Sequence, residues 1–296
     1  MGAVVVLNLH RVAPEYNPFW QPMVPSDFDH LLTFVKRHFQ PTTFAELSEP
    51  YSGQRPRIIL SFDDGYYDFV EYVMPLLDNH RIRVNQNVIG SCVNTGEPPT
   101  TVALFDFLNQ APPSLINEIK LPGFEASSVD RRPETKSQFG IKLSAFIKNR
   151  PRIEREALLQ QLAPILAKAA QKKTTRMMTV GDIVSVAATH EIGSHSHSHD
   201  SMQFETDEYF AQDLARSQTF FQSELGLPLK IYAFPNGGHR PELLNVLANA
   251  GIEHILLVEE RLAHGRGRVH PRLTMRAESP AEARFEALGF KAKGTQ

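Results

Sequence analysis

Two adjacent carboxylates, Asp63 and Asp64, directly follow the apolar run RIILSF at 57–62 and precede Gly65. Like charges a few ångströms apart raise each other's pKa, and burial at the end of a strand raises it further. A bound cation offsets that cost, with one carboxylate as its ligand and the other free as a general base. Gly65 permits a tight turn that aims both side chains into one pocket. The competing interpretation is an ordinary Asp-Asp-Gly surface turn.

Three of the chain's 12 histidines, His195, His197 and His199, alternate with serines. An extended strand would place the outer Cα atoms roughly 13 Å apart, which strains two imidazoles that share one ion. A turn brings positions i and i+4 to about 6 Å, and Gly193 and Ser194 favour a turn. We therefore predict that His195 and His199 bind a metal ion and that His197 points elsewhere. A His-rich surface loop is the alternative.

Two His and one carboxylate leave open positions on a divalent ion, which can then acidify a water molecule and polarise a carbonyl. The residue types alone thus predict metal-assisted hydrolysis. The single Cys92 can form neither an intrachain disulfide nor a thiolate metal site, and we expect it to be a small buried apolar residue. The net charge of −2 argues against a nucleic-acid partner.

Strands alternate with helices along the chain, which predicts an α/β fold with parallel strands. The expected strands are 3–9, 57–62, 81–89, 191–193, 229–234, 252–258 and 269–275. The expected helices include 67–77, 152–172, 205–225 and 241–250. The segment from about 97 to 179 has helical patterns and no clear strand, so we predict a helical insertion within one domain over 1–296. The polar motifs follow strands, where barrels and open sheets place their sites.

The motifs SFDDG and HSHSH resemble the first two motifs of the polysaccharide deacetylases, the NodB-homology group of carbohydrate esterase family 4. The stretches NLHRV and YAFPNGG are similar too, and the resemblance extends roughly from Val4 to Met275. It implies a distorted (β/α) barrel of about seven strands, fewer than the eight of the commoner barrel. It also implies an enzyme that removes an acetyl group from an N-acetylated sugar with a divalent ion, Zn²⁺ being expected and Co²⁺ or Ni²⁺ the alternatives.

The resemblance implies a role for each matching residue. Asp63 is the general base, and the backbone N–H of Asn236, after Pro235, helps to form the oxyanion hole. The implied metal ligands are Asp64, His195 and His199.

Three positions depart from the family pattern. Ala233 occupies the place of an Arg that pairs with the catalytic Asp, and Asn236 replaces a Tyr. Val258 follows Leu256-Leu257 where the family has a His, so the general acid is in doubt.

Residues of the last predicted strand offer substitutes for the missing groups. We hypothesise that His270 is the general acid and that Arg272 replaces the missing Arg as the partner of Asp63. The alternative is a basic surface loop over 261–272. His10 ends the first strand, where one branch of the family also has a His, and it either lines the substrate pocket or bonds a neighbouring carbonyl. Trp20 is expected to serve packing rather than sugar stacking.

The leading hypothesis is a metal-dependent amidohydrolase acting on an N-acetylated sugar, an oligosaccharide, or a lipid-linked or nucleotide-linked glycan precursor. A catalytically silent carbohydrate-binding homologue is the first alternative, because two family residues are missing. A hydrolase of another amide, such as a formamide or a cyclic imide-like bond, is the second. Neither a signal peptide nor a membrane span is recognisable, so a cytoplasmic location is expected.

Overall fold

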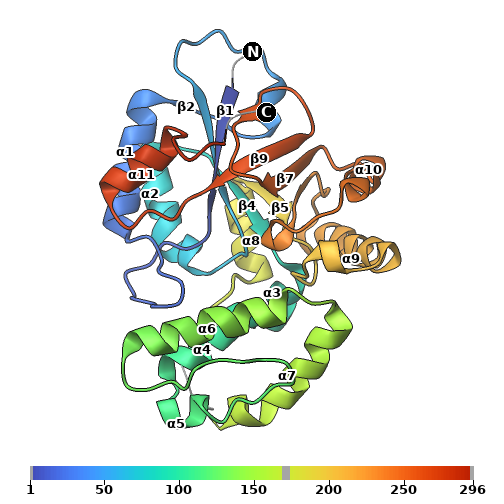
Figure 1. Cartoon of the computed structure of the whole chain (residues 1–296). Helices are drawn as coiled ribbons and strands as arrows, with labels where there is room; N and C mark the ends of the chain where they lie inside the picture. The colour runs from blue at the N-terminus through green and yellow to red at the C-terminus, as the bar shows by residue number, and fades with distance from the viewer. Residues whose placement is uncertain (1–2, 169–173, 294–296) are drawn as a thin grey trace.

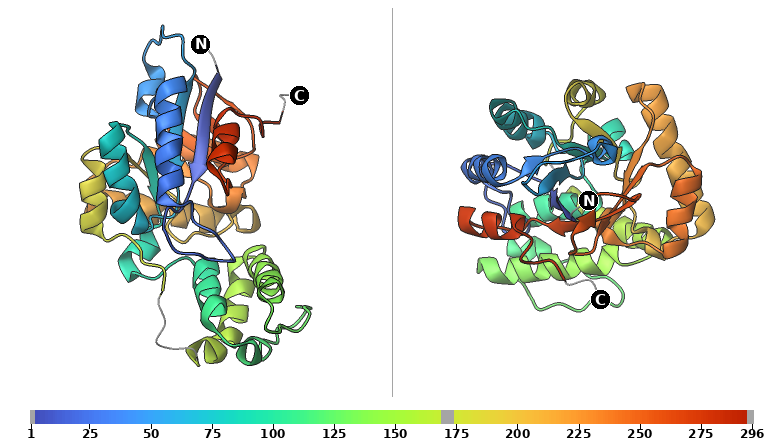
Figure 2. Two further views of the ribbon diagram at one scale, coloured as in Figure 1. Left: turned by 90° about the vertical axis from the view of Figure 1, so that its left-hand side faces the viewer. Right: turned by 90° about the horizontal axis from the view of Figure 1, so that it is seen from above.

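In the computed structural model, which describes residues 3–168 and 174–293, seven parallel strands close into a barrel (Figure 1). Their order is β1-β3-β4-β5-β6-β7-β9, and β9 returns to pair with β1. The strands are β1 (Ala3–Leu9), β3 (Arg57–Phe62), β4 (Asn85–Val88), β5 (Glu191–Ser194), β6 (Ile231–Ala233), β7 (His254–Val258) and β9 (Val269–Thr274). Short strands β2 (Gln40–Pro41) and β8 (Ala263–His264) extend the sheet. The predicted (β/α) barrel is confirmed, and Figure 2 shows its ring from above.

Strand β4 is shorter than the predicted strand 81–89. Arg81 adopts a left-handed conformation with φ 56°, which ends helix α2 (Met74–His80), and its N–H bonds the carbonyl of Asp78. The strand therefore begins only at Asn85. The amino-terminal part of the expectation is wrong because this segment serves as the helix cap.

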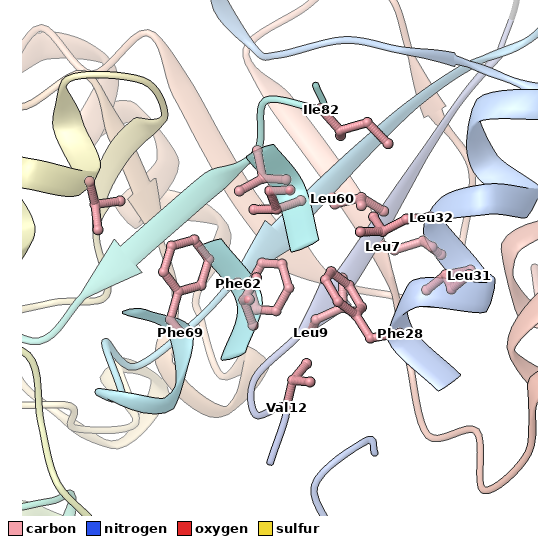
Figure 3. Close-up of a cluster of buried hydrophobic side chains, with 14 of the residues drawn as sticks. Leu7, Leu9, Val12, Phe28, Leu31, Leu32, Leu60, Phe62, Phe69 and Ile82 are labelled. Atoms are coloured by element: carbon pink, nitrogen blue, oxygen red, sulfur yellow. The ribbon is translucent and has the colours of Figure 1, made fainter. Parts of the chain in front are cut away.

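Helices cover the outside of the barrel. They are α1 (Pro25–His38), α2, α3 (Gly90–Thr95), α8 (Val180–Ala187), α9 (Asp207–Phe220), α10 (Pro241–Asn249) and α11 (Pro280–Ala287). Between α1 and the sheet, Leu7, Leu9 and Phe62 meet Phe28, as Figure 3 shows, and the Phe28 and Phe62 rings are 5.8 Å apart. Burial of each such side chain stabilises the fold by about 1.5–3 kcal/mol. The predicted helix 205–225 is confirmed, its last turn being a π-helix over Phe221–Leu225.

A second layer of helices lies across the carboxyl ends of the strands (Figures 1 and 2). It consists of α4 (Thr100–Gln110), α5 (Pro113–Ile116), α6 (Pro133–Lys148) and α7 (Arg152–Ala167), with a hydrophobic cluster of its own. Phe19, from the loop after β1, stacks on Phe105 and lies so near Gly140 that a Cβ there would be 2.6 Å from its ring. The helical character expected between 97 and 179 is thus observed. Residues 169–172 of the predicted helix 152–172 lie outside the described residues.

Among the described residues, no helix combines the length and apolar character needed to cross a membrane.

Candidate metal and active site

Asp64, His195 and His199 meet at the carboxyl end of the barrel. Their ligand atoms all lie within 4.8 Å of one another. Asp64 Oδ1 is 3.4 Å from His195 Nε2 and 3.2 Å from His199 Nε2. Strand β3 delivers the carboxylate and β5 the first His, and these strands flank β4. Asp64 and His195 belong to sequence motifs that lie more than 130 residues apart, yet they form one cluster.

The HSHSH segment forms the turn that the metal hypothesis requires. Ser196 and His199 take left-handed φ values of 60° and 61°, and the His199 N–H donates to Ser196 Oγ over 2.7 Å. The Asp213 carboxylate of α9 accepts the N–H groups of His197 and Ser198. The His197 ring packs against Gly90, where a Cβ would lie 2.6 Å from Nδ1. As predicted, His197 points away from the cluster, and Asp213 is a supporting residue that no sequence signal indicated.

The three side chains fit a divalent cation. His195 Nδ1 lies 3.0 Å from the Ala233 carbonyl, so that it acts as the donor and leaves the Nε2 lone pair facing Asp64. Burial lowers the pKa of His195 to about 4, and the imidazole is neutral at pH 7. Burial opposes ionisation of Asp64, but the adjacent His199 and His195 rings outweigh it and hold its pKa below the usual range. Asp64 Oδ1 is buried without a hydrogen-bond partner. One carboxylate oxygen and two imidazole nitrogens suit Zn²⁺, Co²⁺ or Ni²⁺.

Asp63 is clamped beside this cluster by Arg272. The guanidinium donates from Nη1 to Oδ1 and from Nη2 to Oδ2, both over 2.8 Å, and Asn87 Nδ2 donates to Oδ1 over 2.8 Å. Burial opposes ionisation of Asp63, yet Arg272 and His195 outweigh it and lower its pKa to about 2. The hypothesised contact between Arg272 and Asp63 is present, and Arg272 is completely buried inside the barrel rather than on a surface loop.

Polar residues in the barrel interior support this ion pair. Ser61 Oγ donates to Asn85 Oδ1 over 2.7 Å and accepts from Arg272 Nη1 over 3.1 Å. A Cβ at Gly193 would lie 2.2 Å from Asn87 Oδ1, so only glycine leaves room for that amide. Ser61, Asn85, Asn87 and Gly193 were not among the site residues predicted from the sequence. The signal was the polarity of alternate positions 85 and 87 in a strand, which places both side chains on the inner face.

A cavity of about 390 Å³ opens over the cluster. Its walls include Asp63, Asp64, His195 and His199, together with His10 and Trp20 from the β1 side. Helices α4 and α6 close it from the other side.

Other predicted site residues lie around this cavity. The Trp20 ring meets His10 at 5.1 Å and Tyr66 at 5.6 Å, both edge-on, and the Tyr66 hydroxyl donates to Asp64 Oδ2 over 2.7 Å. Asn236 lines the cavity in a left-handed conformation with φ 56°, next to the buried Pro235.

The structure does not bring His270 to the cavity. Its ring lies in the barrel interior, 5.1 Å from the Phe44 ring, and Nε2 is 3.1 Å from His254 Nδ1. Burial, followed by the neighbouring His254, lowers the pKa of His270 to about 4. His270, which was predicted from the sequence to be the general acid, is therefore packed against Phe44 and His254 in the barrel interior. It belongs to strand β9, as Arg272 does, but lies nearer the amino end of that strand.

The fold and the cluster together define a (β/α) barrel in which side chains able to hold a metal ion lie at the carboxyl ends of the strands. A family profile described as polysaccharide deacetylase matches residues 154–255, which include His195 and His199. This match agrees with the resemblance drawn from the motifs of the chain.

Several solved structures share the fold. The deacetylase PplD of Streptococcus pyogenes, determined with acetate, is 13% identical with a TM-score of 0.61, over 99% of each chain. IcaB from Ammonifex degensii is 16% identical with a TM-score of 0.60, over 96% of this chain and 97% of that one. A de-N-acetylase from Aggregatibacter actinomycetemcomitans is 13% identical with a TM-score of 0.62, over 97% and 100%. Comparison with curated protein sequences found no match.

Proposed function

We propose that the protein is a metal-dependent hydrolase that removes the acetyl group from an N-acetylated amino sugar of a glycan or glycan precursor. The observation that carries the proposal is the placement of a clamped carboxylate, Asp63, beside the Asp64–His195–His199 cluster in one cavity. The family match and the deacetylases that share the fold support the same reaction class.

Asp64, His195 and His199 would hold the ion, with Zn²⁺ expected and Co²⁺ or Ni²⁺ as alternatives. Such an ion supplies Lewis acidity, which polarises an amide carbonyl and acidifies a water molecule. The Ala233 carbonyl holds the His195 ring in the tautomer that offers Nε2. The turn formed by Ser196 and His199 positions the His199 ring, the second imidazole of the cluster.

Asp63 is the proposed general base. Its Oδ2 lies 3.8 Å from His195 Nε2, which places the carboxylate next to the metal ligands. The Arg272 fork keeps Asp63 ionised and orients both oxygens, so that it is ready to accept a proton from the attacking water. Arg272 therefore pairs with Asp63 in place of the family's Arg, whose position Ala233 occupies.

His10 is the proposed proton donor to the departing amine. Breaking a C–N bond requires that the nitrogen leave protonated. Among the described residues that line the cavity, His10 is the histidine outside the metal cluster, and it lies near enough to Asp63 and Asp64 to help lower the pKa of both carboxyls. The His10 ring packs against the Trp20 ring in an edge-to-face arrangement. The backbone N–H of Asn236 is the proposed donor to the developing oxyanion.

The test is acetate release from a panel of N-acetylated amino sugars with added Zn²⁺ or Co²⁺. We expect metal-dependent release, lowered about 100-fold or more in Asp63→Asn. The control is Asp78→Asn, an exposed carboxylate on α2, which should leave the rate unchanged. The N-formyl counterparts of the same sugars are assayed in parallel for formate release. Absence of turnover on both sets would favour a silent carbohydrate-binding protein, and formate release without acetate release would favour a deformylase.

A further inference from the structure

Two basic side chains line the catalytic cavity from opposite sides. Lys148 is the last residue of α6 in the helical layer, and Arg276 follows β9 of the barrel. Lys148 is half-buried, whereas Arg276 is exposed at the rim. The two charges are close enough that Arg276 adds to the effect of burial in lowering the pKa of Lys148.

Neither charge is neutralised by a carboxylate among the described residues. In the described ranges 3–168 and 174–293, Lys148 and Arg276 form no ion pair with a carboxylate. The carboxylates that line the same cavity are Asp63, held by Arg272, and Asp64, held in the His cluster.

Buried cations elsewhere near this layer do have partners. Arg155 of α7 contacts Asp200, and Arg11 donates to Asp68 over 2.7 Å. A half-buried ammonium that faces a second cation is unfavourable on both counts, because burial and a like charge each penalise the charged form. An anion placed between the two cations removes the repulsion and adds charge-assisted hydrogen bonds.

We propose that Lys148 and Arg276 bind an anionic oxygen group, a phosphate or a carboxylate, of the N-acylated sugar substrate. This specificity inference rests on the proposed deacetylase function. The sugar then lies between two anchors, with its amide at the Asp64 cluster and its acidic group between helix α6 and the loop after β9. A neutral glycan lacks the second anchor and binds more weakly.

Binding tests the proposal without turnover. The full chain carrying Asp63→Asn is titrated with three probes: an N-acetylhexosamine 1-phosphate, an N-acetylhexosamine linked to a uronic acid, and the uncharged methyl glycoside. We expect at least one charged probe to bind about ten-fold more tightly than the glycoside, in line with hydrogen bonds to charged groups. Preference for the first probe identifies phosphate as the anion, and preference for the second identifies carboxylate. Equal dissociation constants for all three probes would overturn the proposal.

Substitution locates the anion. Lys148→Gln and Arg276→Gln together should reduce the preference to less than about two-fold, and a preference that survives them would overturn the assignment. Lys142→Gln on α6 and Arg284→Gln on α11 remove exposed charges outside the cavity and should change nothing. In the active enzyme, the two cavity substitutions should raise KM for the charged substrate about ten-fold with kcat nearly unchanged. Charge-dependent binding without acetate release would refute the proposed function alone, whereas release with no charge preference would refute this inference alone.

Discussion

Asp63 and Arg272 are 209 residues apart in the chain, yet each of the two guanidinium Nη atoms donates to one of the two carboxylate oxygens inside the barrel. Arg272 lies on β9, which closes the barrel by pairing with β1. Strand β1 also pairs with β3, and Asp63 directly follows β3. The ion pair is therefore a product of barrel closure.

Replacement of Arg272 by Lys should impair the base without removing the charge. Lysine cannot make the two parallel bonds, so Asp63 loses its fixed orientation and its pKa rises from about 2 toward the ordinary value. We expect kcat to fall about 10- to 100-fold and the acid limb of the pH profile to move to higher pH. The measurement is acetate release from pH 3 to 9 on protein whose folding is checked by circular dichroism. Arg284→Lys, at an exposed site, is the control, and a wild-type profile in Arg272→Lys would contradict the role.

Asp64 should decide metal occupancy. Metal-loaded protein should contain one ion per chain, and Asp64→Ala should weaken the affinity about 100-fold or more, because two neutral imidazoles remain without an anionic ligand. Metal analysis after dialysis and calorimetric titration measure this. The matched control for the His ligands is His264→Gln, an exposed histidine on β8. Unchanged stoichiometry and affinity in both Asp64→Ala and His195→Ala would show that the ion binds elsewhere or not at all.

His10 and His270 make opposite predictions about the general acid. His10→Gln should lower kcat about 100-fold or more, since it removes the proton donor from the cavity. His270→Gln should leave kcat within a few-fold of wild type, because this ring contacts Phe44 and His254 instead. Steady-state rates on the same substrate decide between them. A large loss in His270→Gln with none in His10→Gln would restore the assignment made from the sequence.

His270 should make stability depend on pH. Its pKa is about 4 in the folded protein, against 6.5 for an unperturbed imidazole, so the unfolded chain binds more protons between these values. The free energy of unfolding therefore rises with pH through this window, and acidification from pH 6.5 to 4 removes about 3 kcal/mol through this group. Urea unfolding of the metal-free protein between pH 4.5 and 7 measures the slope. His270→Gln should flatten it, and His264→Gln should not; identical slopes in wild type and His270→Gln would contradict the prediction.

Much of the site could be recognised from local sequence. Asp63 and Asp64 follow an apolar run, and the alternation of His with Ser restricts His195 and His199 to a turn. These features depend on neighbouring residues alone, so they are visible without a fold. The resemblance of the motifs to one family predicted the barrel, which the structure confirms, and a metal site. The family profile matches residues 154–255, in agreement with that resemblance.

The sequence could not predict how far along the barrel axis the side chains of the last strand lie. His270 and Arg272 are two residues apart and face the same interior, but an extended strand separates them by about 6.6 Å along its axis. The register of β9 places Leu273 beside Leu7 and Thr274 beside Asn8. His270 consequently lies toward the amino end of the strands, while His10 lies beyond the carboxyl end of β1, at the cavity.

By itself the sequence determined the residue types of the candidate metal cluster, the alternation of strands and helices, and the resemblance to one family. The tertiary structure decided which residues come together. Arg272 clamps Asp63, His10 rather than His270 lines the cavity, and Lys148 and Arg276 both line it. The physical reason is that the candidate metal ligands belong to short sequence motifs. Ion pairs and cavity walls instead depend on the register between the strands that close the barrel. No local pattern encodes that register.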